Sequence, residues 1–316
     1  MMNRQLKGSL FNIQFNSTED GPGIRTTLFM KGCPMRCPWC HNPEGISRSP
    51  QLVWYESRCI GDEKCVGKCP KGALALTEKG IVIDRKICDA CGQCVDVCPS
   101  AALELLGKEY TVEEAADLVL RDKVFYEKSG GGMTLSGGEP AMQNEFGAAL
   151  MQVVKSEGVH VALDTCLGVG WKVLSPLVEL ADLVLLDIKT MDESDHLRFT
   201  GIPLKWVLDN ARKVSETKTP IWVRTPVIPG YTDKADSIRQ IARFIRSELP
   251  SACRYDILAF NKICEPKYAR LGMSWTLAGT DLLTEAVMAR LEAEAKAEGV
   301  EFARWSGMTN IDKGNG

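Results

Sequence analysis

Cysteine is the residue type that most limits what this chain can fold into. Of its 13 cysteines, ten fall between Cys33 and Cys98 in a sequence of 316 residues. Residues 1–15 lack the apolar core and cleavage site of a signal peptide, and no apolar run approaches the roughly 20 residues of a membrane span. We therefore expect a cytoplasmic protein, and reducing conditions there disfavour structural disulfides. So many cysteines in that compartment predict metal ligation.

The overall charge gives no general reason to expect a nucleic acid partner. The formal net charge is -3, and no block of like charges marks a binding tail. Hydrophobic residues make up 45% and charged residues 25% of the chain, which is typical of a globular protein. We expect neither nucleic acid nor a membrane among the partners, so function must be argued from local motifs.

Apolar runs alternate with amphipathic windows along most of the chain. The predicted strands are residues 26–30, 133–135, 160–165, 183–189, 221–228 and 255–260. The predicted helices lie near residues 112–126, 142–156, 171–180, 204–216, 234–248 and 280–299. Such alternation is typical of the α/β class, in which helices cover the outer face of a parallel sheet. Six strands in this order predict a partial (β/α)6 barrel of the TIM type.

Residues 52–108 interrupt this alternation, and we predict that they form a small inserted domain. They hold seven cysteines and only short predicted elements, so burial alone could not stabilise so small a unit. Residues 1–51 and 109–316 would then form the barrel domain. The second half of the insert, "CDACGQCVDVCP", has the C-x2-C-x2-C-x3-C-P spacing of bacterial ferredoxins, which makes the insert ferredoxin-like. The first half, "CIGDEKCVGKCP", differs only in that Asp62 stands at the second position.

In a two-cluster ferredoxin the fourth cysteine of each run ligates the other cluster. This rule predicts one full 4Fe-4S cluster held by Cys69, Cys88, Cys91 and Cys94. It predicts a second cluster held by Cys59, Cys65 and Cys98, with Asp62 as the candidate fourth ligand. Three interpretations of the second cluster stay open: carboxylate ligation by Asp62, a three-iron cluster, or water or another donor at the odd iron. A purely structural insert that serves as a docking surface is a further alternative.

A third cysteine group lies ahead of the insert. The stretch "GCPMRCPWCHNPEG" places Cys33, Cys37 and Cys40 at C-x3-C-x2-C spacing. Three thiolates on one tight loop suit a 4Fe-4S cluster that keeps one iron open for a non-protein ligand. A zinc knuckle with His41 as fourth ligand is the alternative. We favour the cluster because the loop follows the first predicted barrel strand, where barrel enzymes place catalysis.

This loop and several other stretches resemble the glycyl radical enzyme activating enzymes of the radical S-adenosylmethionine superfamily. The stretches are "EDGPGIRTTLFMKGC", "HNPEG", "SGGGMTLSGGEP", "LDT", "DIK" and "RTPVIPGYTD", and the resemblance spans residues 9 to about 272. It implies that the open iron chelates S-adenosylmethionine, which is cleaved reductively to methionine and a 5'-deoxyadenosyl radical. That radical would abstract hydrogen from a glycine Cα of a partner glycyl radical enzyme. A low-potential donor such as flavodoxin or ferredoxin would supply the electron.

The resemblance also implies a set of residues that bind the cofactor. They are Trp39, His41, Asn42, Gly137, Gly138, Glu139, Asp164, Thr165, Asp187, Lys189, Arg224 and Asn261. Most lie at the carboxyl ends of predicted strands, where parallel barrels build their active sites.

Each group of these residues has an expected task. The two glycines lack Cβ atoms and would receive the methionyl amino group. Asp164, Thr165 and Asp187 carry oxygens that suit ribose hydroxyls or a monovalent cation. Lys189 and Arg224 would meet the ligand's carboxylate, although a plain ion pair between Asp187 and Lys189 is the alternative.

The turn at Asp20, Gly21 and Gly23 corresponds to the place where the partner's glycine loop docks in the family, and a simple tight turn is the alternative. Relatives often carry a histidine where this chain has Asn261, which can form hydrogen bonds but cannot titrate.

Residues outside these motifs are expected to be structural. We expect Cys166, Cys253 and Cys264 to be small buried hydrophobes, and we expect His160 and His196 to be surface or core residues.

Two other functions compete with the activating enzyme. One is a radical enzyme that acts on a small molecule, and the other is a non-catalytic electron-transfer protein built on the insert. The "DGPGIR" and "SGGGMTLSGGEP" stretches argue against the first, and Cys33, Cys37 and Cys40 would be unexplained in the second.

Overall fold

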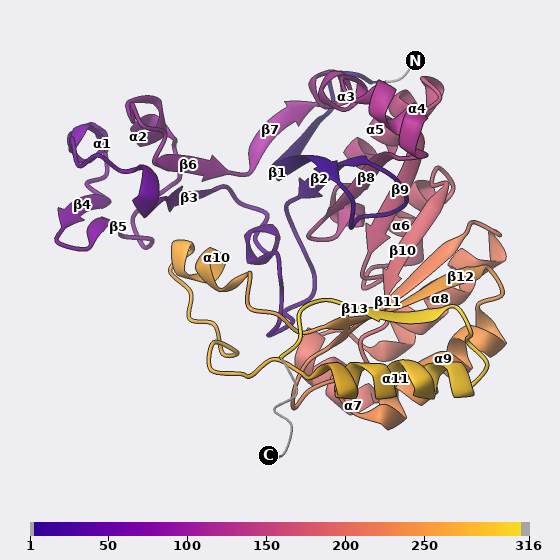
Figure 1. Ribbon diagram of the computed structural model, residues 1–316. Coiled ribbons are helices and arrows are strands. Elements are labelled where there is room, and N and C mark those ends of the chain that lie inside the picture. The colour runs from indigo at the N-terminus through magenta and orange to yellow at the C-terminus, as the bar shows by residue number, and fades with distance from the viewer. Residues whose placement is uncertain (1–2, 311–316) are drawn as a thin grey trace.

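The computed structural model describes residues 3–310, and a mixed sheet forms its centre (Figure 1). The sheet has nine strands within the described chain, in the order β13-β12-β11-β10-β9-β8-β2-β1-β7. The parallel strands are β2 (Arg25–Met30), β8 (Gly132–Gly137), β9 (His160–Thr165), β10 (Leu183–Asp187), β11 (Ile221–Val227), β12 (Ala252–Ala259) and β13 (Ala303–Ser306). Strands β1 (Lys7–Ser17) and β7 (Lys108–Thr111) extend one edge in antiparallel pairing. The α/β class with a largely parallel sheet is therefore confirmed.

Helices connect the strands, and those that cover one face of the sheet are α3 (Val112–Leu120), α4 (Lys123–Ser129), α5 (Asn144–Ser156), α6 (Trp171–Val178), α8 (Leu204–Glu216), α9 (Ala235–Glu248) and α11 (Glu285–Ala297). Helices α7 (Glu193–Thr200) and α10 (Glu265–Arg270) instead contribute Phe199 and Tyr268 to a separate cluster around Trp39. Among the described residues, none of the helices is long and apolar enough to cross a membrane.

Several predicted elements differ from those observed. The helix predicted near residues 112–126 is two helices, because Asp122 turns inward and accepts a hydrogen bond from Thr26 Oγ1 at 3.0 Å. Strands β1, β7 and β13 and helix α7 were not expected. β13 is short and half polar, and α7 has little apolar character and depends on its Asp192 cap. The strand predicted at residues 183–189 ends at Asp187, so Lys189 lies beyond it.

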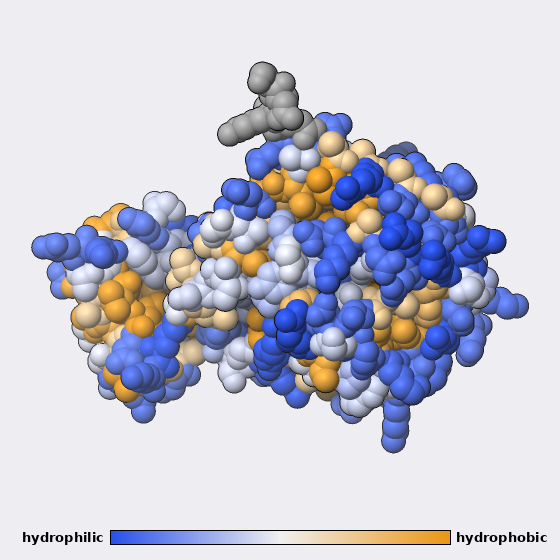
Figure 2. Space-filling model, turned by 90° about the horizontal axis from the view of Figure 1, so that it is seen from below, coloured by the Kyte–Doolittle hydropathy of each residue, from blue (hydrophilic) through white to orange (hydrophobic). Residues whose placement is uncertain are grey.

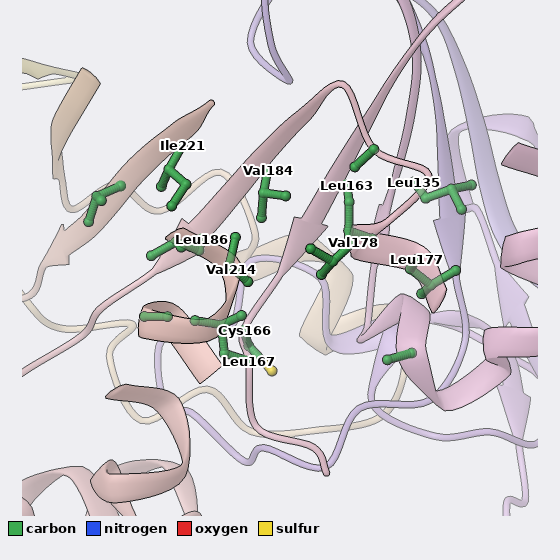
Figure 3. Packing of buried hydrophobic residues seen from close by; sticks show 14 of the residues in the cluster. Leu135, Leu163, Cys166, Leu167, Leu177, Val178, Val184, Leu186, Val214 and Ile221 are labelled. Atoms are coloured by element: carbon green, nitrogen blue, oxygen red, sulfur yellow. The ribbon is translucent and has the colours of Figure 1, made fainter. Parts of the chain in front are cut away.

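Side chains alternate across the sheet and separate its two faces. In β9, Val161 and Leu163 enter the main apolar core beneath the helices, whereas Ala162 and Asp164 belong to the opposite face. Figure 3 shows Leu163 in this core. Helices α5, α6, α8 and α9 contribute their apolar sides to the same core. The face without helices is thus left for polar groups.

The cysteine-rich insert forms a lobe beside the sheet (Figure 1). Figure 2 shows this lobe in space-filling form. It contains the paired strands β3 (Gln51–Trp54) and β6 (Leu103–Leu106), the hairpin β4 (Leu74–Thr77) with β5 (Gly80–Ile83), and the short helices α1 (Lys64–Lys68) and α2 (Gln93–Asp96). The lobe has a small apolar cluster of its own, in which cysteines are packed among leucines.

The lobe is anchored at its base to the rest of the protein. Val53 and Leu106 of the lobe strands pack against Phe11 and Phe29 of the central sheet and against Leu271, which follows α10.

The core position of Leu163 yields a test of this architecture. Leu163 is 0% exposed, so Leu163→Ala should lower the free energy of unfolding by about 2–5 kcal/mol through lost burial and a residual cavity. Urea unfolding followed by circular dichroism measures the change. Gln152→Ala, on the exposed side of α5, is the control and should change stability by less than about 0.5 kcal/mol. Equal effects of the two substitutions would contradict the placement of the core.

Candidate active site at the carboxyl ends of the strands

The cysteine loop follows β2 and is fixed to the end of β8 by backbone hydrogen bonds. The Glu139 N–H donates to the Gly32 carbonyl at 2.7 Å, and the Gly138 N–H donates to the Met30 carbonyl at 2.8 Å. A Cβ atom on Gly138 would lie 2.3 Å from the Gly32 oxygen and 2.6 Å from the Gly45 oxygen. Glycine is therefore required here by the close approach of two backbones, a reason that the sequence did not suggest.

The three thiols of this loop lie close together and are free of disulfides. Burial, together with the charges of the neighbouring thiols, raises the pKa of Cys37 to about 11 and that of Cys40 to about 12. Without a bound cation, the thiolate forms of these cysteines are therefore unfavourable. A bound metal would stabilise the thiolates, because metal ligation requires the deprotonated thiol. The donor set, three thiols from one loop, fits an iron-sulfur cluster with an open position.

A segment after β12 clamps this loop from the other side. Tyr268 Oη donates to the Cys40 carbonyl at 2.9 Å, and Trp275 Nε1 donates to the Pro38 carbonyl at 3.0 Å. Lys267 Nζ donates to the His41 carbonyl at 3.0 Å and to Asn42 Oδ1 at 2.9 Å. No motif in the sequence pointed to this clamp, because its residues are far from the loop in the chain.

Three of the predicted cofactor-binding residues near the loop, Trp39, His41 and Asn261, lie in different environments. Trp39 is buried and packs edge-on against Phe199 and Tyr231. His41 is exposed, and Asn261 accepts a hydrogen bond from the Ile263 N–H at 3.1 Å. Asn261 therefore caps its own turn in this structure.

Glu139 is fully buried beside the loop. Its Oε2 accepts hydrogen bonds from Thr165 Oγ1 at 2.8 Å and from the Cys166 N–H at 2.9 Å, and Oε1 accepts one from the Ala141 N–H at 3.1 Å. Burial raises the pKa of this carboxyl, while these donors act in the opposite direction. Glu139 thereby ties the end of β9 to the end of β8.

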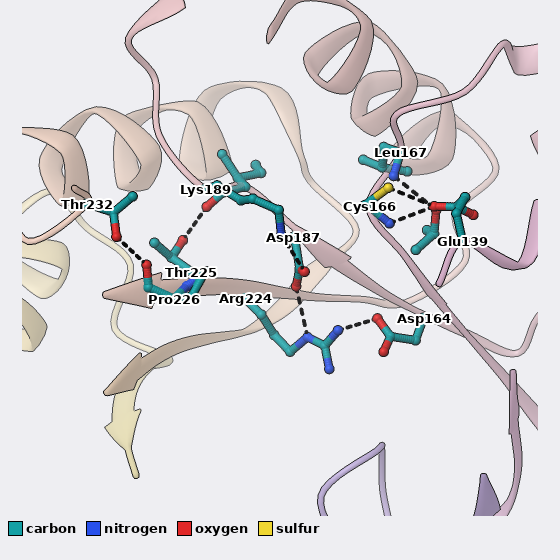
Figure 4. A network of polar contacts seen from close by, with 12 residues as sticks. Glu139, Asp164, Cys166, Leu167, Asp187, Lys189, Arg224, Thr225, Pro226 and Thr232 are labelled. Atoms are coloured by element: carbon teal, nitrogen blue, oxygen red, sulfur yellow. Dashed lines mark hydrogen bonds and ion pairs between the residues drawn. The ribbon is translucent and has the colours of Figure 1, made fainter. Parts of the chain in front are cut away.

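A chain of charged groups crosses the neighbouring strand ends on the face without helices (Figure 4). Arg224 Nε donates to Asp187 Oδ1 at 3.2 Å, and its Nη2 donates to Asp164 Oδ1. Lys189 Nζ donates to Asp187 Oδ2 at 2.9 Å. Asp164 also accepts a hydrogen bond from Ser136 Oγ at 2.7 Å, a site neighbour that sequence reasoning missed although it directly precedes Gly137.

The two carboxyls of this chain have opposite pKa shifts. Burial raises the pKa of Asp164 to about 6, and Arg224 limits that rise. Burial would also raise the pKa of Asp187, but Lys189 and Arg224 together hold it below its usual value. Asp187 is therefore the better-compensated carboxylate, and Asp164 depends on Arg224 alone among cations that contact it in the described chain.

The turn at residues 20–23 reaches the same polar face. Asp20 Oδ2 accepts hydrogen bonds from Ser17 Oγ at 2.6 Å and from Thr27 Oγ1 at 2.8 Å. Gly23 has a φ of +67°, and a Cβ there would lie 2.4 Å from the Gly131 nitrogen. The "DGPG" turn and the glycine-rich stretch "SGGGM" thus lie against each other, and Gly21 is buried between Asp20 and Arg25.

In the insert, the fold brings cysteines of the two runs together. Cys69, Cys88, Cys91 and Cys94 line one hollow. Burial and the nearby Cys98 and Cys59 raise the pKa of Cys65. Asp62 forms an ion pair with Lys64 at 3.3 Å. Among the described residues, no three His, Cys, Asp or Glu side chains converge on a single metal ion.

The remaining cysteines and histidines partly follow expectation. Cys264 and His196 are buried, as expected, but Cys253 is exposed, so its prediction as a buried residue was wrong. Cys166 is buried, yet its neighbours are Glu139 and Cys33 rather than apolar groups alone. The Cys166 environment could not be anticipated from the sequence, because nothing in the motif "LDTC" shows where the thiol points.

The charged side chains Asp164, Arg224 and Asp187 lead to a prediction of how stability depends on pH. Arg224→Met removes the cation between the two carboxyls, so the folded-state pKa of Asp164 rises further above its unfolded value and that of Asp187 loses part of the depression that Arg224 causes. A raised carboxyl pKa costs stability as pH increases through it, so the loss should be about 3–5 kcal/mol at pH 8 and smaller at pH 5. Urea unfolding at both pH values measures it, with exposed Arg246→Met as the control. Equal losses at pH 5 and pH 8 would contradict the assigned network.

Comparison with known proteins agrees with this geometry. The Radical SAM superfamily model matches residues 27–245. The chain is 40% identical to the (2S)-3-sulfopropanediol dehydratase activating enzyme of Klebsiella oxytoca, over 87% of this chain and 89% of that protein. It is 36% identical to the benzylsuccinate synthase activating enzyme of Thauera aromatica, over 91% of this chain and 89% of that protein. The chain therefore belongs to the radical SAM superfamily and, within it, to the activating enzymes of glycyl radical enzymes.

Proposed function

We propose that this chain activates a partner glycyl radical enzyme by placing a radical on a glycine Cα of that partner. The observation that carries the proposal is the meeting of three groups at one edge of the sheet. The first group is the three thiols of the cysteine loop, and the second is the Gly138–Glu139 backbone that is hydrogen-bonded to this loop. The third is the row of charged side chains formed by Asp164, Arg224, Asp187 and Lys189.

A 4Fe-4S cluster held by Cys33, Cys37 and Cys40 would supply the electron that cleaves S-adenosylmethionine to methionine and a 5'-deoxyadenosyl radical. The protein's own groups bind and orient that molecule. Arg224 uses Nε and Nη2 for the two aspartates, and its Nη1 has no partner within residues 3–310. Nη1 and the remaining protons of Lys189 are therefore available to a ligand carboxylate.

Asp164 and Asp187 are proposed to bind the part of S-adenosylmethionine that lies away from its carboxylate. The Asp164 and Asp187 oxygens that Arg224 does not contact accept one hydrogen bond each, from Ser136 and Lys189, and the second acceptor position of each oxygen suits ribose hydroxyls or a monovalent cation. Thr165 already donates to Glu139, so its proposed part is to keep that carboxylate in place. Lys189 and Thr165 are buried and Asp164, Asp187 and Arg224 are largely shielded from water, which strengthens each polar contact.

The partner's glycine loop is proposed to approach from the face without helices. Asp20 and Gly21 lie on that face, and the Asp20 carboxylate is held there by Ser17 and Thr27. This placement supports the docking role proposed for Asp20, Gly21 and Gly23. The identity of the partner's own substrate depends on the partner's pocket and is not encoded in these residues.

The insert is proposed to be a ferredoxin-like domain of residues 52–108 that carries two auxiliary clusters. The hollow lined by Cys69, Cys88, Cys91 and Cys94 supports one 4Fe-4S cluster. The proximity of Cys59, Cys65 and Cys98 supports a second cluster, with Asp62 as the candidate fourth ligand and a three-iron cluster or another donor as the alternatives. A low-potential donor such as flavodoxin or ferredoxin would deliver electrons to the protein.

Substitution of the loop cysteines tests the catalytic assignment. Cys33→Ala, Cys37→Ala and Cys40→Ala should each abolish reductive cleavage of S-adenosylmethionine, because the cluster loses a ligand, while iron bound by the insert remains. Product analysis after anaerobic incubation with dithionite measures cleavage, and exposed Cys253→Ala is the control with unchanged rate. Cleavage at the unsubstituted rate in any loop variant would refute the assignment.

Substitution of Asp62 tests the proposed second auxiliary cluster. If its carboxylate holds the fourth iron, the unsubstituted protein and Asp62→Cys should both bind about 12 irons per chain, for three four-iron clusters. Asp62→Ala should release one iron and produce the paramagnetic signal of an oxidised three-iron cluster. Asp117→Cys, an exposed residue of α3, controls for an added thiol. A three-iron signal in the unsubstituted protein that Asp62→Cys removes would contradict ligation by Asp62.

A further inference from the structure

Arg85 of the insert contacts α10, the helix that clamps the cysteine loop. Its Nη1 donates to the Leu52 carbonyl at 3.0 Å, and its Nη2 donates to the carbonyl of Arg270, the last residue of α10. A Cβ atom on Gly272 would lie 2.9 Å from Arg85 Nε, so the guanidinium passes closely over the turn that follows the helix. Figure 1 shows α10 beside the lobe. The sequence motifs assign no task to Arg85.

This contact caps the carboxyl end of a short helix. The last carbonyl groups of an α-helix have no partner within the helix, and the helix dipole favours a positive charge at that end. Helix α10 has only six residues, so its own hydrogen bonds cannot hold it in place. Arg85 supplies both a donor and a cation there. The position of α10 therefore depends on the insert.

Two further contacts join the insert to the same end of α10. The Arg270 guanidinium lies over the Tyr55 ring, 4.9 Å from the ring centroid. Leu271 is buried and packs against Val53 and Leu106 of the lobe strands. The carboxyl end of the helix is thus bound to the insert by side-chain hydrogen bonding, by a cation–π contact and by apolar packing.

The side chains of α10 that point away from the insert hold the cysteine loop. Tyr268 Oη donates to the Cys40 carbonyl, and Lys267 Nζ donates to the His41 carbonyl and to Asn42 Oδ1. The carbonyl that Arg85 caps lies within one helical turn of both side chains. A shift of the capped end would therefore move the groups that hold the loop.

We propose that Arg85 is a positioning residue for the catalytic site. By capping α10 it keeps Lys267 and Tyr268 on the carbonyls of the cysteine loop, and it thereby strengthens the binding of S-adenosylmethionine at that loop. This gives the insert a task that needs no electron transfer through it. The inference rests on the proposed function, since it assigns the loop to binding of this cofactor. In the purely structural alternative, Arg85 anchors the lobe and has no effect on the loop.

The first test is amide hydrogen exchange in the full-length, iron-loaded protein under anaerobic conditions. Arg85→Met removes both donors and the charge, and exchange at residues 36–42 should become about fivefold faster, the factor expected for loss of one hydrogen bond. Arg58→Met is the matched control, because Arg58 also lies over the Tyr55 ring, at 4.2 Å, but makes no hydrogen bond to α10 among residues 3–310. A change confined to residues 52–108 would overturn the proposal, because Arg85 would then only anchor the lobe.

The second test is a double-substitution cycle on the dissociation constant of S-adenosylmethionine, measured without reductant so that no cleavage occurs. Arg85→Met and Tyr268→Phe should each weaken binding about fivefold. If Arg85 acts through α10, the loss in the double variant should be clearly smaller than the product of the two single losses. Losses that multiply would overturn the proposal, as would an unchanged dissociation constant in Arg85→Met.

Two other outcomes are resolved by the same measurements. If Arg85→Met loses iron from the insert, Arg85→Lys takes its place, because lysine keeps the charge but cannot bridge the Leu52 and Arg270 carbonyls. Exchange at residues 36–42 should then rise in Arg85→Lys, and unchanged exchange would overturn the proposal. An unsubstituted protein that binds no S-adenosylmethionine would instead refute the proposed function, while the exchange measurement would still decide whether Arg85 supports the loop.

Discussion

The close approach of two backbone segments organises the active site. The end of β8 and the start of the cysteine loop touch at Gly138 and Gly32, neither of which has a Cβ atom. The Glu139 N–H donates to the Gly32 carbonyl in this contact. Any side chain at Gly138 would separate the loop from the sheet. The three thiols are consequently held at a fixed distance from the strand ends that carry the ligand-binding groups. A site built on such rigid elements needs little rearrangement when it binds its ligands.

The sheet keeps its chemistry and its stability on opposite faces. Leu163 and Asp164 are neighbours in β9, yet one is packed under the helices and the other is bound to Arg224. The apolar face contributes most of the burial, and the polar face holds two carboxyls whose charges are balanced by Arg224 and Lys189. This separation allows a chain of buried charges to exist without interrupting the core, because each charge has a partner of opposite sign.

The insert follows a different principle. Its apolar cluster is small and includes Cys65 and Cys94, so the groups proposed to hold iron are also the groups that fill its interior. Metal binding and packing of this lobe are therefore expected to be coupled. Its attachment through Val53 and Leu106 places the lobe at the edge of the sheet that carries β1 and β7.

The sequence by itself determined the α/β class, most of the parallel strands, and the residues that gather at their carboxyl ends. It did so because apolar periodicity and cysteine spacing are local properties of the chain. The single helix predicted over residues 112–126 was wrong because a tertiary contact divides it, and strand β13 was not predicted because its pairing at the sheet edge decides its conformation. The clamp on the cysteine loop by Lys267, Tyr268 and Trp275 was decided only by the tertiary structure. It joins residues more than two hundred positions apart in the chain, and only the closed fold brings such residues within hydrogen-bonding distance.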